Sequence, residues 1–201
     1  SVLDLGCGNG QHSLKIAKKC KRVIGVDYNL DQLFIAKKTA EDKNIKKIKF
    51  SKLNLEKKLP FQDKSFDKIL ALDILEHLNK RKQFLSEIKR ILKPKGVVFI
   101  TAPNKNTSWK KLQKKSGLNF YTDPDHKIEY SLDEIKKTLF QSRFKILSIK
   151  SIIYDTSLAG FIDLIGSFSL KLYKKLSLWK KKKVEDNLKE SIGFRIKMRE
   201  I

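Results

Sequence analysis

The amino-acid sequence predicts an α/β domain built around a mostly parallel sheet. Short apolar runs typical of buried strands alternate along the chain with amphipathic helical patterns. The first apolar run, residues 2–5, passes through a glycine-rich turn directly into a helical pattern. A chain of 201 residues is also long enough to bury one sizeable core. Because parallel strands need crossover connections, usually helices, this alternation favours a layered α/β architecture.

The hydrophobic period predicts each element in turn. Strands are expected at residues 2–5, 22–27, 47–53, 66–72, 97–101, 144–153 and 194–201. Helices are expected at residues 11–19, 31–43, 81–92 and 131–141. The Pro94-Lys95-Gly96 string ends the third helix, and Ser131 with Glu134 forms a capping box that begins the fourth. The last strand alternates apolar and charged residues, which is typical of an edge strand.

Residues 155–190 differ in character from the rest of the chain. Apolar residues recur there at mostly three- and four-residue steps, which predicts a helical stripe of Leu158, Phe161, Ile162, Ile165, Phe168, Leu172 and Leu176. We therefore divide the chain into a core at residues 1–154, a helical insertion at 155–190 and a final core strand at 191–201. No run of 18 or more uncharged apolar residues occurs, so nothing here is expected to span a membrane.

The formal charge of +23 is the strongest feature of the composition. A basic surface can attract nucleic acid or anionic lipid. The excess is nearly all lysine, however, whereas bidentate recognition of phosphate or guanine favours arginine. The lysines are spread over almost every predicted helix, with one dense run at Lys180 to Lys183. The charge is therefore compatible with a solvated, lysine-rich surface as well as with an anionic partner.

The two cysteines, Cys7 and Cys20, have neither the spacing of a metal motif nor the number for a disulfide framework. We therefore expect no metal site and a reducing, cytoplasmic setting. Cys7 lies in the glycine-rich turn, where we expect its small side chain to serve packing.

The turn after the first strand has the composition of a nucleotide site. Glycines at alternate positions, Gly6, Gly8 and Gly10, let the backbone turn tightly and bring its N–H groups to a ligand at a helix N-terminus. Asp27 ends the next strand, where an acidic side chain can bind ribose hydroxyls. A tight turn without a ligand is the alternative.

The spacing and charge of this turn indicate which nucleotide it binds. A dinucleotide fingerprint needs its third glycine at position 11, which is Gln11 here. Asp4 precedes the first glycine, and a carboxylate there would repel a pyrophosphate but suits a cationic ligand without phosphate. The Asp-Leu-Gly-Cys-Gly-Asn-Gly string resembles the first motif of class I S-adenosylmethionine-dependent methyltransferases.

Several later segments strengthen this resemblance. Residues 53–67, 73–78, 92–96 and 123–144 are similar, in order and spacing, to further motifs of the small-molecule, type 11-like methyltransferase families, although Lys95 replaces a glycine. The resemblance covers residues 2 to about 150. It implies a Rossmann-like seven-stranded, mostly parallel sheet with strand order 3-2-1-4-5-7-6, an antiparallel last strand and helices on both faces. It also implies S-adenosylmethionine as the cofactor.

The resemblance assigns roles to particular residues. The methionine and sulfonium side of the cofactor would be held by Asp4, Gly6, Cys7, Gly8 and Gly10, and the ribose by Asp27. Adenine would be contacted by Tyr28, Asn54 and Leu55. The methyl-transfer cleft would be lined by Leu72 and Asp73. Asn54 stands where the family usually has aspartate, and it can accept the same hydrogen bond. A turn residue that closes the third strand is the alternative for Asn54.

His77 and His126 are the candidate general bases, because imidazole can take a proton from an attacking hydroxyl near neutral pH. A base is needed only when the acceptor must lose a proton. The alternatives are that His77 orients a helix and the pocket, and that His126 pins a loop. Glu76 can be interpreted as a simple charge at a helix N-terminus.

These features predict a methyltransferase that modifies oxygen or carbon of a small-molecule or lipid-like acceptor. Residues 155–190 resemble the helical lids that cover the acceptor pocket in this superfamily. Their apolar stripe and lysines suggest peripheral contact with an anionic membrane through residues 158–183. The rivals are an RNA (tRNA) methyltransferase, which the charge alone supports, and a non-catalytic cofactor-binding partner subunit. Because Ser1 lies directly on the first strand, we expect the natural N-terminus upstream; acceptor and oligomeric state stay open.

Overall fold

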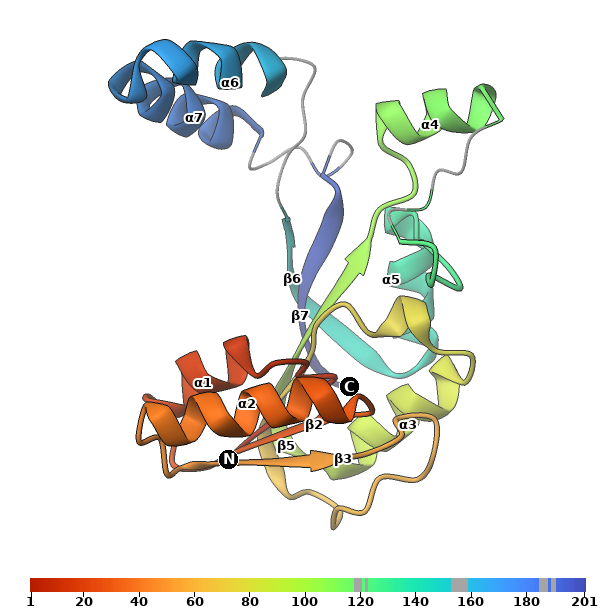
Figure 1. Cartoon of the computed structure of the whole chain (residues 1–201). Coiled ribbons are helices and arrows are strands. Elements are labelled where there is room, and N and C mark those ends of the chain that lie inside the picture. The colour runs from red at the N-terminus through yellow and green to blue at the C-terminus, as the bar shows by residue number, and fades with distance from the viewer. Residues whose placement is uncertain (118–120, 122, 153–158, 185–187, 189–190) are drawn as a thin grey trace.

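The computed structural model describes residues 1–117, 121, 123–152, 159–184, 188 and 191–201 (Figure 1). Its strands form one seven-stranded sheet in the order β3-β2-β1-β4-β5-β7-β6. Their bounds are Val2–Leu5 (β1), Val23–Asp27 (β2), Ile48–Lys52 (β3), Phe66–Ala71 (β4), Leu92–Pro103 (β5), Phe144–Ser151 (β6) and Gly193–Glu200 (β7). Only β7 runs antiparallel to its neighbours, β5 and β6. The strand order and orientation confirm the predicted fold.

The helices of the described residues fall between these strands. Their bounds are Gln11–Ala17 (α1), Leu30–Asp42 (α2), Leu75–His77 (η1, a 3-10 turn), Arg81–Ile91 (α3), Ser108–Lys115 (α4), Leu132–Gln141 (α5), Ala159–Phe168 (α6) and Leu170–Val184 (α7). The capping box of α5 is present, since the Glu134 N–H donates to Ser131 Oγ and the Ser131 N–H donates to the Glu134 carboxylate. Helix α4 was not predicted.

The helices cover both faces of the sheet because the buried strands present apolar side chains on both faces. In β1, Leu3 and Leu5 point into the cluster that α3 and α5 complete, whereas Val2 points into the cluster of α1 and α2. The same alternation divides Val26 from Val23 in β2. Burial on both sides is typical of the centre of a parallel sheet. It fixes where β1 and β2 end, and therefore where the glycine loop begins.

Two strand predictions need correction. The strand expected at 97–101 extends over Leu92–Pro103, and α3 ends at Ile91. Phe66 pairs with Leu92 but Lys68 pairs with Val97, so the extra residues form a bulge inside β5 in which Lys95 has a φ of 66°. The last strand is not an edge strand, because β7 lies between β5 and β6. Its alternating pattern reflects one exposed face, which an interior strand can also have.

The apolar stripe of the insertion also differs from expectation. It forms two helices, α6 and α7, which pack on one another and project beyond the end of β6 and β7 (Figure 1). The break lies at Ser169, whose Oγ accepts a hydrogen bond from the Leu172 N–H at 3.3 Å. Residues 155–158, and the side chains of Lys180 to Lys183, lie outside the described residues. Whether this hairpin covers an acceptor pocket stays a prediction.

Within the described part of the chain, we find no helix with both the length and the apolar character needed to cross a membrane.

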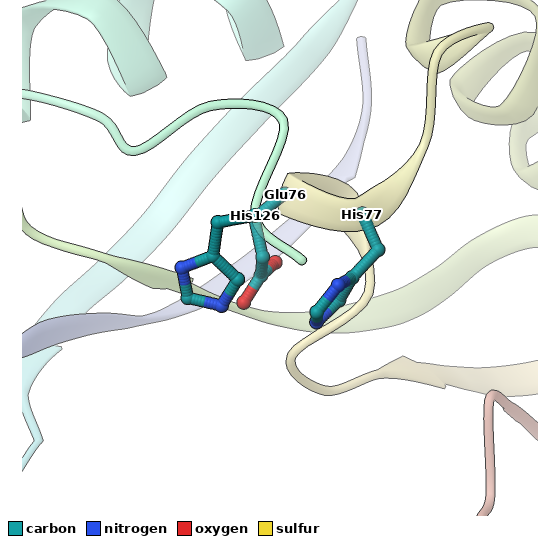
Figure 2. Close-up of side chains that lie close together, drawn as sticks. All are labelled: Glu76, His77 and His126. Atoms are coloured by element: carbon teal, nitrogen blue, oxygen red, sulfur yellow. The ribbon is translucent and has the colours of Figure 1, made fainter. Parts of the chain in front are cut away.

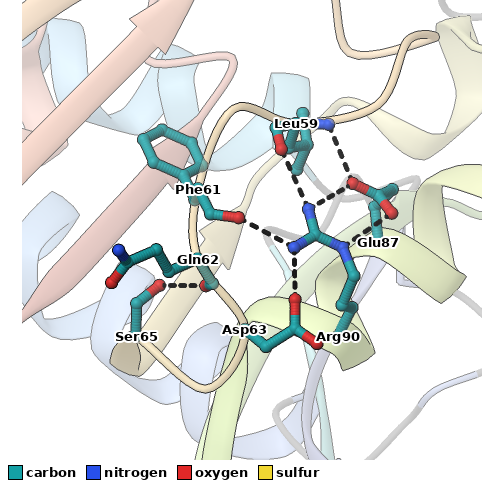
Figure 3. A network of polar contacts seen from close by, with 7 residues as sticks. All are labelled: Leu59, Phe61, Gln62, Asp63, Ser65, Glu87 and Arg90. Atoms are coloured by element: carbon teal, nitrogen blue, oxygen red, sulfur yellow. Dashed lines mark hydrogen bonds and ion pairs between the residues drawn. The ribbon is translucent and has the colours of Figure 1, made fainter.

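Arg90 on α3 holds the loop between β3 and β4 in place (Figure 3). Its guanidinium donates to the carbonyl oxygens of Leu59 and Phe61 at 2.9 and 2.7 Å and to the Asp63 carboxylate at 2.7 Å. It also forms a two-pronged pair with Glu87, at 2.9 and 2.6 Å, which lowers the pKa of that carboxyl group. The anchored loop follows Asn54 and Leu55, so Arg90 also stabilises the segment assigned to adenine.

We predict that Arg90→Lys lowers the free energy of unfolding by about 1–3 kcal/mol, because an ammonium group cannot replace the planar fork that reaches two carbonyls and two carboxylates. Urea denaturation followed by circular dichroism measures the change. Arg22→Lys, at an exposed arginine, is the matched control and should be neutral within about 0.5 kcal/mol. Equal stability of Arg90→Lys and wild type would contradict the assigned role.

Candidate functional site

The glycine loop between β1 and α1 forms an open cradle of backbone. Gly10 begins α1 with a φ of 76°, and a Cβ there would meet the Phe50 ring at 2.8 Å, so only glycine fits. Gly8 has a φ of 50°, yet a Cβ there would meet nothing nearer than Gln32 Oε1 at 4.0 Å. Space therefore lies beside Gly8, where a ligand can approach the backbone. The Cys7 side chain faces the core, as expected for packing.

Asp27, at the end of β2, is tied to this loop. Its Oδ2 accepts the Gly8 N–H at 2.8 Å, and its Oδ1 accepts the Asn29 N–H at 2.9 Å. A carboxylate has about four acceptor positions, so two remain for ribose hydroxyls. The half-buried Asp27 can therefore fix the loop and bind a ribose at the same time.

The residues assigned to adenine lie at the ends of β2 and β3. Tyr28 is 67% exposed, and the Lys52 ammonium lies 4.9 Å from its ring centroid, which leaves the other ring face for a base. Asn54 Oδ1 accepts the Glu56 N–H at 2.9 Å, so the side chain closes a turn as the alternative interpretation expected. That oxygen keeps a second acceptor position for an adenine amino group. Leu55 is buried beside it.

Asp4 lies under the loop rather than in an open crevice. It is 2% exposed, and its Oδ2 accepts a hydrogen bond from Ser13 Oγ at 2.5 Å. Burial raises the pKa of the Asp4 carboxyl group, and the Ser13 hydrogen bond opposes this only in part. A bound cation nearby would favour the charged form of Asp4, which fits a sulfonium ligand.

The chain after β4 adopts a strained conformation next to the loop. Asp73 has a φ of 53°, and Thr101 holds it by accepting its N–H and donating to its Oδ1, both at 2.7 Å. Leu72 beside it is half-buried. Ile74 packs directly on Gly6, where an added Cβ would lie 1.9 Å from its side chain. The η1 turn that follows therefore begins beside the cradle.

His77 and His126 meet at this turn, as Figure 2 shows, together with Glu76. The two imidazole rings are edge to face with centroids 4.9 Å apart. One ligand atom from each of Glu76, His77 and His126 lies within 4.8 Å of the others. Lys127 donates its N–H to the Glu76 carbonyl at 2.8 Å, which pins the loop carrying His126 against η1. The structure thus brings together two candidates that lie 49 residues apart.

Glu76 is not the exposed helix charge that the sequence suggested. It is 1% exposed, and its Oε2 has no hydrogen-bond partner among the described residues. Burial, with the nearby carboxylates of Asp73, Glu129 and Asp123, raises the pKa of Glu76 to about 8.

Two further residues position His126, and sequence reasoning missed both. Glu129 Oε1 lies 3.1 Å from His126 Nδ1, and Glu129 also forms a fully buried ion pair with Lys110 on α4. A paired carboxylate can only accept, so Nδ1 donates, and in the neutral ring Nε2 then carries the lone pair. The three-residue spacing of His126 and Glu129 could have indicated their contact. Nothing in the sequence indicates that Lys110 pairs with Glu129.

The glycine loop, the acidic residue at the end of β2 and the turns after β3 and β4 are typical of a nucleotide-binding α/β domain. The sequence model of a methyltransferase domain matches residues 1–176. The chain therefore belongs to this methyltransferase-domain family.

Two curated relatives illustrate the similarity. A probable S-adenosylmethionine-dependent methyltransferase of Mycolicibacterium smegmatis is 30% identical over 158 residues, which are 79% of this chain and 57% of that protein. The mitochondrial ubiquinone biosynthesis O-methyltransferase of Rattus norvegicus is 31% identical over 106 residues, which are 52% of this chain and 31% of that protein. The chain thus spans less than two thirds of the length of these relatives.

Solved structures share the fold. An S-adenosylmethionine-dependent methyltransferase from Methanosarcina mazei superposes with a TM-score of 0.70 at 21% identity, covering 100% of this chain and 92% of that one. Magnesium protoporphyrin IX methyltransferase from Synechocystis, with bound SAH, gives a TM-score of 0.66 at 16% identity over 98% of this chain and 72% of that one. At these identities the likeness concerns the architecture.

We predict that Asp4→Asn becomes more stable relative to wild type as pH rises. The raised pKa of Asp4 means that its contribution to stability is present below the unfolded value of 3.8 and is lost as pH rises through the folded pKa. Asparagine does not titrate, so Asp4→Asn does not lose this stability as pH rises. Urea denaturation without cofactor, at several pH values from about 4 upward, measures the difference.

Asp42→Asn, at an exposed position on α2, is the control for this experiment, and its difference from wild type should not follow the same rise. A stability difference between Asp4→Asn and wild type that stays constant over this pH range would contradict the assigned pKa shift.

Proposed function

We propose that this domain transfers the methyl group of S-adenosylmethionine to a hydroxyl oxygen of a small-molecule or lipid-like acceptor. The observation that carries the proposal is the pair of histidines at the η1 turn, which follows directly on the contact of Ile74 with Gly6. A hydroxyl acceptor must lose its proton during transfer, and imidazole can receive it. Similarity to ubiquinone biosynthesis O-methyltransferases supports oxygen over carbon as the methylated atom.

The chain's own residues divide the work of this reaction. Bound S-adenosylmethionine supplies an electrophilic methyl group on a positively charged sulfur. The cradle and Asp27 hold the cofactor side, and Asp73 with the η1 turn holds the acceptor side. Nε2 of His126 would receive the proton of the acceptor hydroxyl while the methyl group passes from the cofactor sulfur to the acceptor oxygen. Most of the acceleration comes from alignment of the partners and exclusion of water.

The α6–α7 hairpin supports an acceptor that lies in an anionic membrane surface. Large apolar side chains are exposed on both helices, namely Leu164, Phe168, Leu170, Leu172, Leu178 and Trp179. Lys171, Lys174 and Lys175 are exposed on α7 among them. Exposed apolar groups mixed with lysines suit the interface of an anionic bilayer. We therefore propose that the hairpin binds such a surface and brings the site to a lipid-like acceptor.

We predict that the purified protein, given S-adenosylmethionine with a labelled methyl group, labels the lipid or small-molecule fraction of a cell extract. The product should resist mild base, as an ether does. His126→Gln should lower kcat about 10²–10⁴-fold, because the proton loses its acceptor. Its affinity for cofactor in calorimetry should not change, since His126 lies on the acceptor side.

His12→Gln is the matched control, because His12 is exposed on α1, and it should retain full activity. Label confined to RNA would instead support the tRNA methyltransferase alternative. Cofactor binding without transfer into any fraction would support the non-catalytic partner subunit.

We predict that the protein co-floats with phosphatidylglycerol vesicles and not with phosphatidylcholine vesicles. Lys174→Gln with Lys175→Gln should weaken binding roughly 30-fold, since each basic residue near an anionic surface contributes about 1 kcal/mol. Lys37→Gln with Lys38→Gln on α2, also exposed, is the control for the lost charge. Equal loss in both double variants would show that net charge, not the hairpin, governs the interaction.

A further inference from the structure

We infer that Glu76, His77 and His126 bind a divalent transition-metal ion on the acceptor side of the site. This inference deepens the proposed function and rests on it for the role of the ion. Two histidines and one carboxylate form a ligand set that suits Zn²⁺ and its neighbours and leaves coordination positions open for a substrate oxygen.

The geometry of the three side chains favours this assignment. They converge from the η1 turn and from the loop that carries His126 (Figure 2), and their ligand atoms lie within 4.8 Å of one another. With metal–ligand bonds of about 2.0–2.1 Å, tetrahedral ligand atoms lie roughly 3.3 Å apart. The ligand atoms therefore need to approach one another by at most roughly 1.5 Å. Rotation about side-chain torsions can supply this approach. Glu76 and His77 are adjacent in the chain, so only the loop with His126 is contributed by a distant segment.

Glu76 supplies a second, independent observation. Its Oε2 is buried and has no hydrogen-bond partner within the described residues. A buried carboxylate oxygen without a partner is costly, because it has lost its hydration. A bound cation removes that cost.

The surroundings of the three residues also suit a cation. The carboxylates of Asp73, Asp123 and Glu129 act electrostatically on Glu76, so acidic groups gather here in a chain with a net charge of +23. Glu129 holds His126 through Nδ1 at 3.1 Å and so leaves Nε2 to bind. Metal-binding histidines commonly have such a carboxylate on their other nitrogen, which fixes the tautomer and raises their basicity.

A metal ion here gives the three residues one shared role. With the ion bound, Nε2 of His126 would be a ligand and no longer the proton acceptor. An open coordination position would instead take the acceptor hydroxyl, lower the pKa of that hydroxyl and release its proton to water. The oxygen would then attack as an anion, and the charge lost from oxygen would match the charge lost from the sulfonium as the carbon–sulfur bond breaks. The acceptors best suited are those whose hydroxyl has a second oxygen beside it, because both could reach the ion.

Calorimetry with ZnCl₂ tests the inference on chelator-treated protein, without cofactor or acceptor. We expect one ion per chain, and Glu76→Gln, His77→Gln and His126→Gln should each weaken binding at least about ten-fold. His12→Gln is the matched control and should bind as wild type does. Co²⁺ provides a second readout, since its visible absorption should change when an imidazole ligand is lost.

Failure of the inference and failure of the proposed function are distinguishable. Wild-type affinity for zinc in both His77→Gln and His126→Gln, or no saturable binding, would overturn the metal site. Full methyl transfer in the presence of a chelator would also overturn it, and would leave histidine as the base. Zinc binding with the expected loss in the variants, but without methyl transfer, would uphold the site and contradict the proposed function.

Discussion

The hydrogen bonds of Asp27 are the constraint on which the site depends. One carboxylate, at the end of a fully buried strand, receives N–H groups from Gly8 and Asn29 and so joins the glycine loop to the start of α2. Burial of β1 and β2 on both faces fixes where these strands end, and the carboxylate then fixes the loop between β1 and α1. Hydrogen bonds within the chain therefore hold the shape of the cradle, and a loop held in this way loses less entropy on binding a ligand.

Much of the fold could be predicted because its signals are local. The strand order followed from the motif resemblance, and the capping box of α5 followed from Ser131 and Glu134 alone. Errors arose where tertiary pairing decided the outcome. The charged and apolar alternation of β7 could not distinguish an edge from an interior strand, and the bulge in β5 depends on its pairing with β4.

In the candidate site, too, features within one segment could be predicted and contacts between distant segments could not. The turn with Gly8 and Gly10 could be predicted because it is one continuous segment, and Asp27 because it ends the next apolar run. The meeting of His77 with His126 could not, because it depends on a backbone hydrogen bond between Lys127 and Glu76 that no spacing reveals. Asp4 directly precedes the loop in the sequence, but its burial against Ser13 could not be predicted because it depends on the packing of α1.

The attachment of the α6–α7 hairpin has a consequence for how such domains diversify. The hairpin is inserted between β6 and β7, which are adjacent antiparallel strands. Hydrogen bonds join these strands up to Ile152, whose N–H donates to the Gly193 carbonyl at 3.1 Å. The register of β6 and β7 is thus set below the insertion and does not depend on its length. This junction allows one helical unit to be exchanged for another while the rest of the sheet and the glycine loop stay unchanged.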